Sequence, residues 1–333
     1  TVSVLYWPPP DQQTTHAHMS TDVDTLTDAA IERILRDNLS EEELNRWESH
    51  DAALLQAFVT ESTAAGRRLV VVTSGGTSVP LERNPVRFVT NFSTGGRGSK
   101  LAEVLLETPE NAVVFLSKRG SLQPFTRVLT ANPQPLDALE AADVVDARQK
   151  HHACRDWLHV VGFESVVEYL FRLRAAVLAV NNTVTTAGTK RPLVMLAAAV
   201  SDYYIPRALM VQHKMSGAAA DGTMTLTFHQ VPKALGVLRR EWGPKIGVVS
   251  FKLETDPEVL EDKALGNLHK YANDAVVANL LPTYKTKATV YVARSAPDGA
   301  RTHEAVLLDA TTGTGTADLE RQIIDTLQQA LDE

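Results

Sequence analysis

Short β-branched apolar runs alternate with helix-periodic segments along most of this chain. The runs at 69–73, 112–116, 193–200, 245–251 and 275–278 have the length and composition of buried strands. Between several of them lie segments whose apolar residues recur every three or four positions, as in amphipathic helices. This alternation predicts an α/β fold built on a doubly wound sheet with helices on both faces.

Helical periodicity covers the segments 28–38, 40–65, 136–180, 257–272 and 316–332. Ser40 is followed three residues later by Glu43, which is the spacing of a capping box. Gly66 is the expected stop signal of that second segment. Asp256 precedes Pro257, so it is the expected N-cap of a helix with proline at its first position.

Weaker signals predict further strands. Residues 126–130 indicate a short third strand, and residues 224–228 alternate as a half-buried strand does. Residues 288–293 and 304–309 predict a terminal antiparallel pair.

No internal repeat or long low-complexity linker divides the chain. We expect residues 1–66 to form an N-terminal arm and helices that pack on the core. We expect residues 67–333 to form one domain, with 131–185 as a helical insertion and 203–231 as a small β excursion.

Charge and cysteine content narrow the classes of function. A formal net charge of -7 argues against nucleic acid as a partner. No apolar run is long enough for a membrane span, and the single cysteine, Cys154, fits a reducing, cytoplasmic location. Cys154 lies near His151, His152 and His159, but a second ligand pair at metal spacing is missing, so we expect no metal site.

Two glycine clusters carry the strongest chemical signal. Ser74-Gly75-Gly76-Thr77 follows the first strand, and Ser93-Thr94-Gly95-Gly96-Arg97-Gly98 precedes a helical pattern. Glycines let backbone N–H groups approach an anion, and a helix start adds positive potential. The combination predicts a phosphate-binding cradle.

A dinucleotide-dependent reductase is one reading of that cradle. The GxGxxG fingerprint is absent, and the second strand ends in Ser117-Lys118-Arg119, without a carboxylate for a ribose. No Tyr-x-x-x-Lys pair is present either. An NADP enzyme that uses Arg119 remains an alternative.

Several motifs resemble those of eukaryotic phosphopantothenate–cysteine ligases (phosphopantothenoylcysteine synthetases). They are TSGGT, PVRFVTNFSTGGRG, AAAVSDYY, HK, VPK, SFKLETD and VVAN, in this order, within residues 69–110 and 193–293. The resemblance implies a Rossmann-like homodimer with a β dimerisation element, here 203–231. It also implies a reaction of coenzyme A biosynthesis, in which 4'-phosphopantothenate and L-cysteine are joined through an acyl-nucleotide. ATP or CTP and Mg²⁺ are then required.

The resemblance also assigns site residues. It places Gly75, Ser93, Gly95 and Gly98 on the nucleotide phosphates, Phe251 and Asn279 on the base and sugar, and Asn91, Ala198, Ala199 and Asp202 on phosphopantothenate, partly from a neighbouring protomer. A neutral amide such as Asn91 suits the reacting carbonyl because it adds no negative charge. Lys214 is our candidate for neutralising the triphosphate.

One position departs from the family pattern. Gly96 stands where human-like sequences have arginine, so Arg97 is left to supply positive charge in that cluster. The FKLETD form resembles enzymes that prefer ATP. A protein that binds nucleotide but has lost catalysis is a further alternative, since a pure binder needs only the glycines and not Asn91, Asp202 and Lys214 together.

Overall fold

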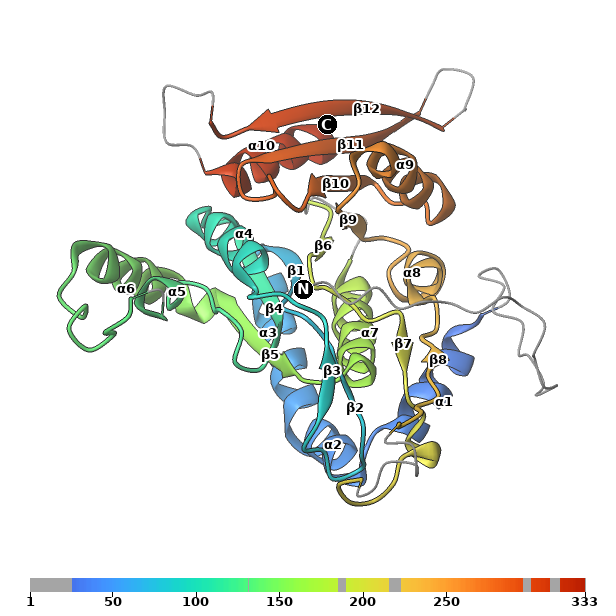
Figure 1. Cartoon of the computed structure of the whole chain (residues 1–333). Coiled ribbons are helices and arrows are strands. Elements are labelled where there is room, and N and C mark those ends of the chain that lie inside the picture. Colours follow the sequence, from blue (N-terminus) through green and yellow to red (C-terminus); the bar gives the residue numbers. More distant parts are fainter. Residues whose placement is uncertain are drawn as a thin grey trace.

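The central element of the computed structural model is an eight-stranded sheet with the strand order β12-β11-β10-β9-β6-β1-β4-β5 (Figure 1). The structure describes residues 26–130, 132–184, 190–215, 223–295, 301–311 and 318–332. The strands of this sheet are β1 (Arg68–Ser74), β4 (Asn111–Lys118), β5 (Leu158–Phe163), β6 (Leu193–Leu196), β9 (Gly247–Glu254), β10 (Ala275–Leu280), β11 (Lys287–Ser295) and β12 (Arg301–Asp309). The predicted α/β fold with a doubly wound sheet is confirmed.

The order of the strands creates a switch point in the middle of the sheet. The chain enters at β1, builds β4 and β5 outward on one side, and then returns to add β6, β9 and β10 on the other. These six strands are parallel to one another, whereas β11 pairs antiparallel with β10 and β12 pairs antiparallel with β11. Because the connections of β1 and β6 leave in opposite directions, their carboxyl ends border the crevice in which open α/β sheets bind ligands.

Helices cover both faces of the sheet. They are α1 (Asp28–Asn38), α2 (Glu41–Arg46), α3 (Ala52–Ala64), α4 (Gly96–Glu107), α5 (Arg127–Thr130), α6 (Ala142–Cys154), α7 (Val166–Thr183), α8 (Ala234–Val237), α9 (Leu260–Lys270) and α10 (Leu319–Asp332). Shorter 3₁₀ or π turns lie at Trp47–Asp51, Arg155–Trp157, Arg207–Leu209, Leu238–Trp242 and Pro257–Val259. Alternate residues of β1 divide the core, because Leu69 and Val71 face α1, α3 and α7 while Val70 and Val72 face α4 and α10.

The N-terminal helices follow the local signals. Ser40 and Glu43 form the predicted capping box, in which the Glu43 N–H donates to Ser40 Oγ (3.2 Å) and the Ser40 N–H donates to Glu43 Oε2 (2.7 Å). α3 ends at Ala64, and Gly66 has a φ of +69°, as expected for a helix stop. Residues 1–25 of the predicted arm lie outside the described residues.

Three secondary-structure predictions are wrong. The interval 136–180 is not helical throughout, because β5 runs through it and forms the edge of the sheet beside β4. Residues 127–130 form the short helix α5 instead of a strand. Residues 224–228 form no strand, although the neighbouring pair β7 (Tyr203–Tyr204) and β8 (His229–Gln230) does form within the β excursion expected at 203–231.

One hairpin was not expected. β2 (Ser78–Pro80) and β3 (Phe88–Thr90) pair with each other in the segment between the two glycine clusters. Each has only three residues, which is too short for an alternation signal. Within the described residues, no helix is long and apolar enough to cross a membrane.

Candidate active site

The carboxyl ends of β1 and β6 stay joined beyond the regular ladder. The Ala199 N–H donates to the Gly75 carbonyl (2.8 Å), and the Thr77 N–H donates to the Ala199 carbonyl (3.0 Å). Gly75 has a φ of +84°, a left-handed conformation that glycine adopts readily. The structure therefore brings Gly75 and Ala199, predicted from two distant motifs, side by side at the switch point.

Two threonine hydroxyls complete this junction, and the sequence analysis did not assign them. The Ala198 N–H donates to Thr73 Oγ1 (3.1 Å), and the Ser201 N–H donates to Thr77 Oγ1 (2.9 Å). Tyr169 from α7 also hydrogen-bonds Thr73, and burial raises the pKa of Tyr169 to about 12, so it is a neutral hydroxyl at physiological pH. The two threonines are the first and last residues of the TSGGT motif, so this motif was the sequence signal that could have identified them.

The β2–β3 hairpin brings Asn91 to the same junction. The Asn91 N–H donates to the Thr77 carbonyl (3.1 Å). A Cβ atom at Gly76 would lie 2.1 Å from the Asn91 carbonyl oxygen, so only glycine allows this approach of two backbones. Among the described residues, the Asn91 side chain has no hydrogen-bond partner, which leaves its amide available to a ligand.

The start of α4 closes the cradle. Ser74 Oγ donates to the Gly95 carbonyl (2.9 Å), and Ser93 Oγ accepts from the Gly95 N–H (3.3 Å). At Gly98, a Cβ atom would lie 2.6 Å from Ser74 Cβ, so the first turn of α4 rests directly on the end of β1. Ser93 and Gly95 precede the first residue of α4, Gly98 lies in its first turn, and a helix N-terminus favours anions.

Arg97 does not take the position expected for it. Its guanidinium points away from the cradle, donates to the Tyr284 carbonyl, and lies 3.0 Å from a carboxylate oxygen of Glu320 on α10. Only 13 % of the Arg97 side chain is exposed. The expectation that Arg97 supplies positive charge to the phosphate cluster is therefore wrong, because the buried carboxylate of Glu320 holds it elsewhere.

Glu320 lies in a small buried charge network beside α4. Lys100 Nζ contacts both Asp318 (2.9 Å) and Glu320 (3.3 Å). Burial and the neighbouring Asp318 raise the pKa of Glu320 to about 7, against the opposing effect of Arg97 and Lys100. This network ties α4 to the C-terminal helix α10.

An open cleft of about 390 Å³ continues from the junction across the ends of β6 and β9. Its lining includes three predicted residues, Ala198, Asp202 and Phe251. The Asp202 carboxylate is 76 % exposed and lies 3.4 Å from Lys233 Nζ. The cleft is therefore lined by residues expected to hold phosphopantothenate and the nucleotide base, and no residue of the two glycine clusters lines it.

Two predicted residues lie apart from this group. Asn279 is buried at the end of β10, and its amide nitrogen donates to the Lys287 carbonyl (2.6 Å), so this side chain also holds the start of β11. Lys214 is exposed, and its segment runs beside the closed end of the β2–β3 hairpin. There the Asn84 N–H donates to the Gln212 carbonyl (3.0 Å). Asn91 is at the opposite, open end of that hairpin, so Lys214 is not brought to the cradle within one protomer.

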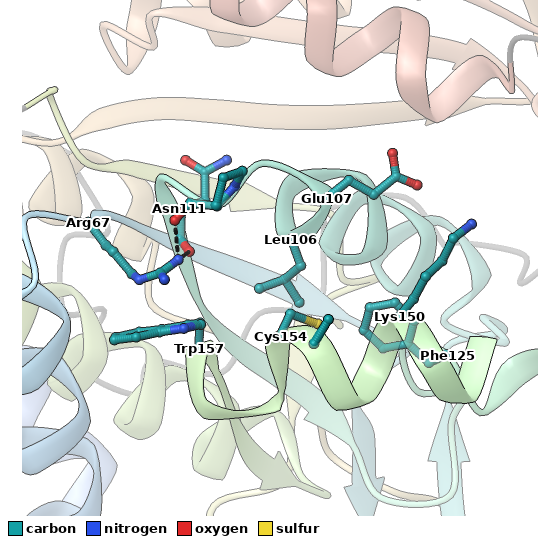
Figure 2. Close-up of a pocket in the computed structure, with 10 residues that line it drawn as sticks. Arg67, Leu106, Glu107, Asn111, Phe125, Lys150, Cys154 and Trp157 are labelled. Carbon is teal, nitrogen blue, oxygen red and sulfur yellow. Dashed lines mark hydrogen bonds between the residues drawn. The ribbon is translucent and has the colours of Figure 1, made fainter. Parts of the chain in front are cut away.

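A second cavity, of about 370 Å³, lies at the opposite end of the strands, beside the amino ends of β1, β4 and β5 (Figure 2). The Arg67 guanidinium stacks 3.6 Å above the ring of Trp157 and donates to the Asn111 carbonyl (3.3 Å). Burial raises the pKa of the Cys154 thiol, which keeps it protonated and weakly reactive. None of the predicted site residues lines this cavity.

Comparisons with known proteins agree with the motifs. Residues 65–156 and 174–295 match the family model of the DNA/pantothenate metabolism flavoprotein C-terminal domain. Phosphopantothenate–cysteine ligase 1 of Oryza sativa subsp. japonica is 40 % identical over 240 residues, covering 66 % of this chain and 70 % of that protein. Phosphopantothenate–cysteine ligase of Homo sapiens is 34 % identical over 303 residues, covering 85 % and 91 %.

A solved structure extends the similarity to three dimensions. A Cab2 mutant in complex with phosphopantothenate-cysteine superposes with a TM-score of 0.76 and 29 % identity, covering 90 % of this chain and 97 % of that chain. The similarity in three dimensions thus extends over most of this chain.

We expect Gly76→Ala to damage the site through its backbone. The added methyl group would meet the Asn91 carbonyl at 2.1 Å, so the hairpin must move and the free energy of unfolding should fall by about 3 kcal/mol or more. Urea denaturation measures this change. Gly266→Ala is the control, because no atom lies within 4 Å of its Cβ position in α9; equal stability of the two variants would contradict the close approach.

A Glu320→Gln variant should expose the pH dependence of the buried network. A carboxyl with a pKa of about 7 in the folded chain, against the ordinary value of 4.5, takes up a proton on folding. Its contribution to stability is present below pH 4.5 and is lost as the pH rises through 7, by about 3 kcal/mol at most. The unfolding free energy of wild type relative to Glu320→Gln should therefore decrease from pH 5 to pH 8, and a constant difference would contradict this pKa.

Proposed function

The chain belongs to the phosphopantothenate–cysteine ligase family, and on that premise we propose that it joins 4'-phosphopantothenate to L-cysteine in coenzyme A biosynthesis. One observation carries the proposal: the family's separate motifs meet at the switch point of the sheet, where Gly75, Asn91 and Ala199 are tied by backbone hydrogen bonds. Two anionic substrates require such a backbone-lined site, because backbone N–H groups bind anions without adding bulk.

The proposed reaction has two steps. A carboxylate oxygen of phosphopantothenate attacks the α-phosphorus of the nucleotide, and the bond to pyrophosphate breaks. The cysteine amine then attacks the acyl carbonyl, the bond to the nucleoside monophosphate breaks, and the amine loses a proton. The products are 4'-phosphopantothenoylcysteine, the monophosphate and pyrophosphate.

Each part of the site has a place in this proposal. Gly75, Ser93, Gly95 and Gly98 line the nucleotide phosphates at the α4 start, where the helix dipole favours negative charge. Asn91 donates to the reacting carbonyl region, which its unpartnered amide can reach without adding charge.

The remaining residues divide between the two substrates. Phe251, within β9, and Asn279, next to the last residue of β10, hold the base and sugar. Ala198, Ala199 and Asp202 bind phosphopantothenate, and Lys214 neutralises the triphosphate.

A second protomer would account for Lys214, which lies apart from the cradle, and would give the exposed Asp202 a partner site. The Asp202 carboxylate is exposed, and Lys214 is distant from the cradle of its own protomer. We propose a homodimer in which the β7–β8 excursion contacts the partner and delivers these side chains to the neighbouring site.

The nucleotide is proposed to be ATP, on the resemblance of the 251–256 segment, with CTP as the alternative. No group of three or more His, Cys, Asp or Glu side chains among the described residues is arranged to hold a metal ion. The Mg²⁺ of this reaction would accordingly be held mainly by phosphate oxygens, and we assign no step to a protein ligand for it.

The reductase alternative has lost its main support. The Arg119 guanidinium makes two hydrogen bonds to the buried Glu168 carboxylate (3.0 and 2.7 Å). An arginine held in this way is not free to bind the 2'-phosphate of NADP.

The first test is turnover. The purified chain should release pyrophosphate when given 4'-phosphopantothenate, cysteine, Mg²⁺ and ATP, and release should depend on phosphopantothenate. Replacing ATP by CTP under the same conditions identifies the preferred nucleotide. A folded protein that is inactive with both nucleotides would refute the ligase proposal, and nucleotide binding without turnover would favour a binding-only protein.

Asn91→Asp should reduce kcat by about 10²-fold or more, the range for losing one polar stabiliser of the transition state. The new carboxylate would lie beside the acyl-nucleotide and repel it. Near-normal turnover in a correctly folded variant would remove Asn91 from the mechanism.

The shared site gives this variant a second use. Mixing inactive Asn91→Asp with inactive Asp202→Ala should restore part of the activity, because each hybrid dimer contains one site with both residues intact. No recovery after proven subunit exchange would place Asn91 and Asp202 in the same protomer's site.

A further inference from the structure

The turn that follows β4 forms a wall of the cradle, although no motif pointed to it. The Leu122 N–H donates to the Thr94 carbonyl (2.9 Å), which joins this turn to the second glycine cluster. A Cβ atom at Gly75 would lie 2.8 Å from Lys118 Cβ, and one at Gly95 would lie 3.1 Å from Ser121 Cβ. The stem of Lys118 therefore begins in contact with the first glycine of the cradle.

Neighbouring cations on α4 and in this turn are committed elsewhere. Arg97 pairs with the buried Glu320 and Lys100 with Asp318 and Glu320. Arg119 makes its two hydrogen bonds to Glu168. The carboxylates of these pairs lie on α7 or at the start of α10. Each pair therefore joins its cation to a helix that packs on the sheet.

Lys118 is held more loosely. Its Nζ lies 3.4 Å from Glu164 Oε1, which is longer than an ordinary charged hydrogen bond. The Glu164 carboxylate is 33 % exposed and already accepts a hydrogen bond from Ser78 Oγ (3.0 Å). Lys118 can therefore exchange this partner at lower cost than Arg97, Lys100 or Arg119 can exchange theirs.

We propose that Lys118 contacts a substrate phosphate at the cradle and supplies the positive charge that Gly96 and Arg97 do not. This inference rests on the proposed ligase function and adds a binding residue to it. On phosphate binding, Nζ leaves Glu164 and donates to a phosphate oxygen, which carries more negative charge than a carboxylate. Both ATP and 4'-phosphopantothenate bring phosphate groups, and kinetics can separate them.

The test compares Lys118→Met with wild type by pyrophosphate release. The KM for one phosphorylated substrate should rise by about 10-fold or more, the range for losing a charged hydrogen bond, while the KM for cysteine stays unchanged. A rise in the KM for ATP assigns Lys118 to the nucleotide, and a rise in that for phosphopantothenate assigns it to the other phosphate. Lys118→Arg should recover most of the loss, because it restores the charge.

Lys150→Met is the matched control. Lys150 is an exposed lysine on α6 and also pairs with a single carboxylate, that of Asp146 (2.9 Å), but it lines the cavity at the opposite end of the strands. Its removal should leave all KM values unchanged. If Lys118→Met fails to fold, Lys118→Gln replaces it, since glutamine keeps a polar side chain on a similar stem.

Unchanged KM values for both ATP and phosphopantothenate would overturn the proposal, and so would a fall in kcat alone. If wild type releases no pyrophosphate, the ligase proposal fails by itself, and the Lys118 inference is tested by calorimetric titration with ATP and with 4'-phosphopantothenate. Binding that weakens in Lys118→Met but not in Lys150→Met supports the inference. Equal binding in all three proteins refutes it.

Discussion

The site depends on one close approach of two backbones, at Gly76 and Asn91. The loop after β1 contacts the hairpin strand β3 on one side and the extension of β6 on the other, through hydrogen bonds between main-chain atoms. Such contacts leave no room for a side chain at Gly76, and they need no side chain for their energy. The result is a surface of backbone groups at the switch point of the described sheet, where the connections of β1 and β6 leave in opposite directions.

The parts of the fold that could be predicted are those in which one local pattern dominates. The runs at β1, β4, β9 and β10 are buried on both faces, so they read as continuous apolar segments. β5 was missed because Leu158–Phe163 is an edge strand with an interposed histidine and glycine, and it lies between two helices whose periodicity obscures it. The strand predicted at 224–228 does not form for the opposite reason: its apolar and polar residues do alternate, but no neighbouring strand pairs with it.

The site divides in the same way. The glycines of the cradle were predictable because backbone approach requires glycine itself, and the motifs marked where it occurs. Side-chain directions were not predictable: Arg97 belongs to the second glycine cluster in sequence, yet it pairs with Glu320, more than two hundred positions later in the chain. Lys118 ends a strand with no motif of its own, and only the packing of its turn against Gly75 connects it to the cradle.

The Arg97–Glu320 contact also has a consequence for the order in which the chain acquires structure during synthesis. Ribosomes add about 5–20 residues per second, so Glu320 is made on the order of 10 seconds or more after Arg97. Throughout that interval Arg97 and Lys100 have no α10 carboxylates to bind, and the apolar face of α4 that α10 covers stays open. The nascent protein therefore acquires its glycine loops early, but the carboxylate of α10 that anchors Arg97 and Lys100 only late.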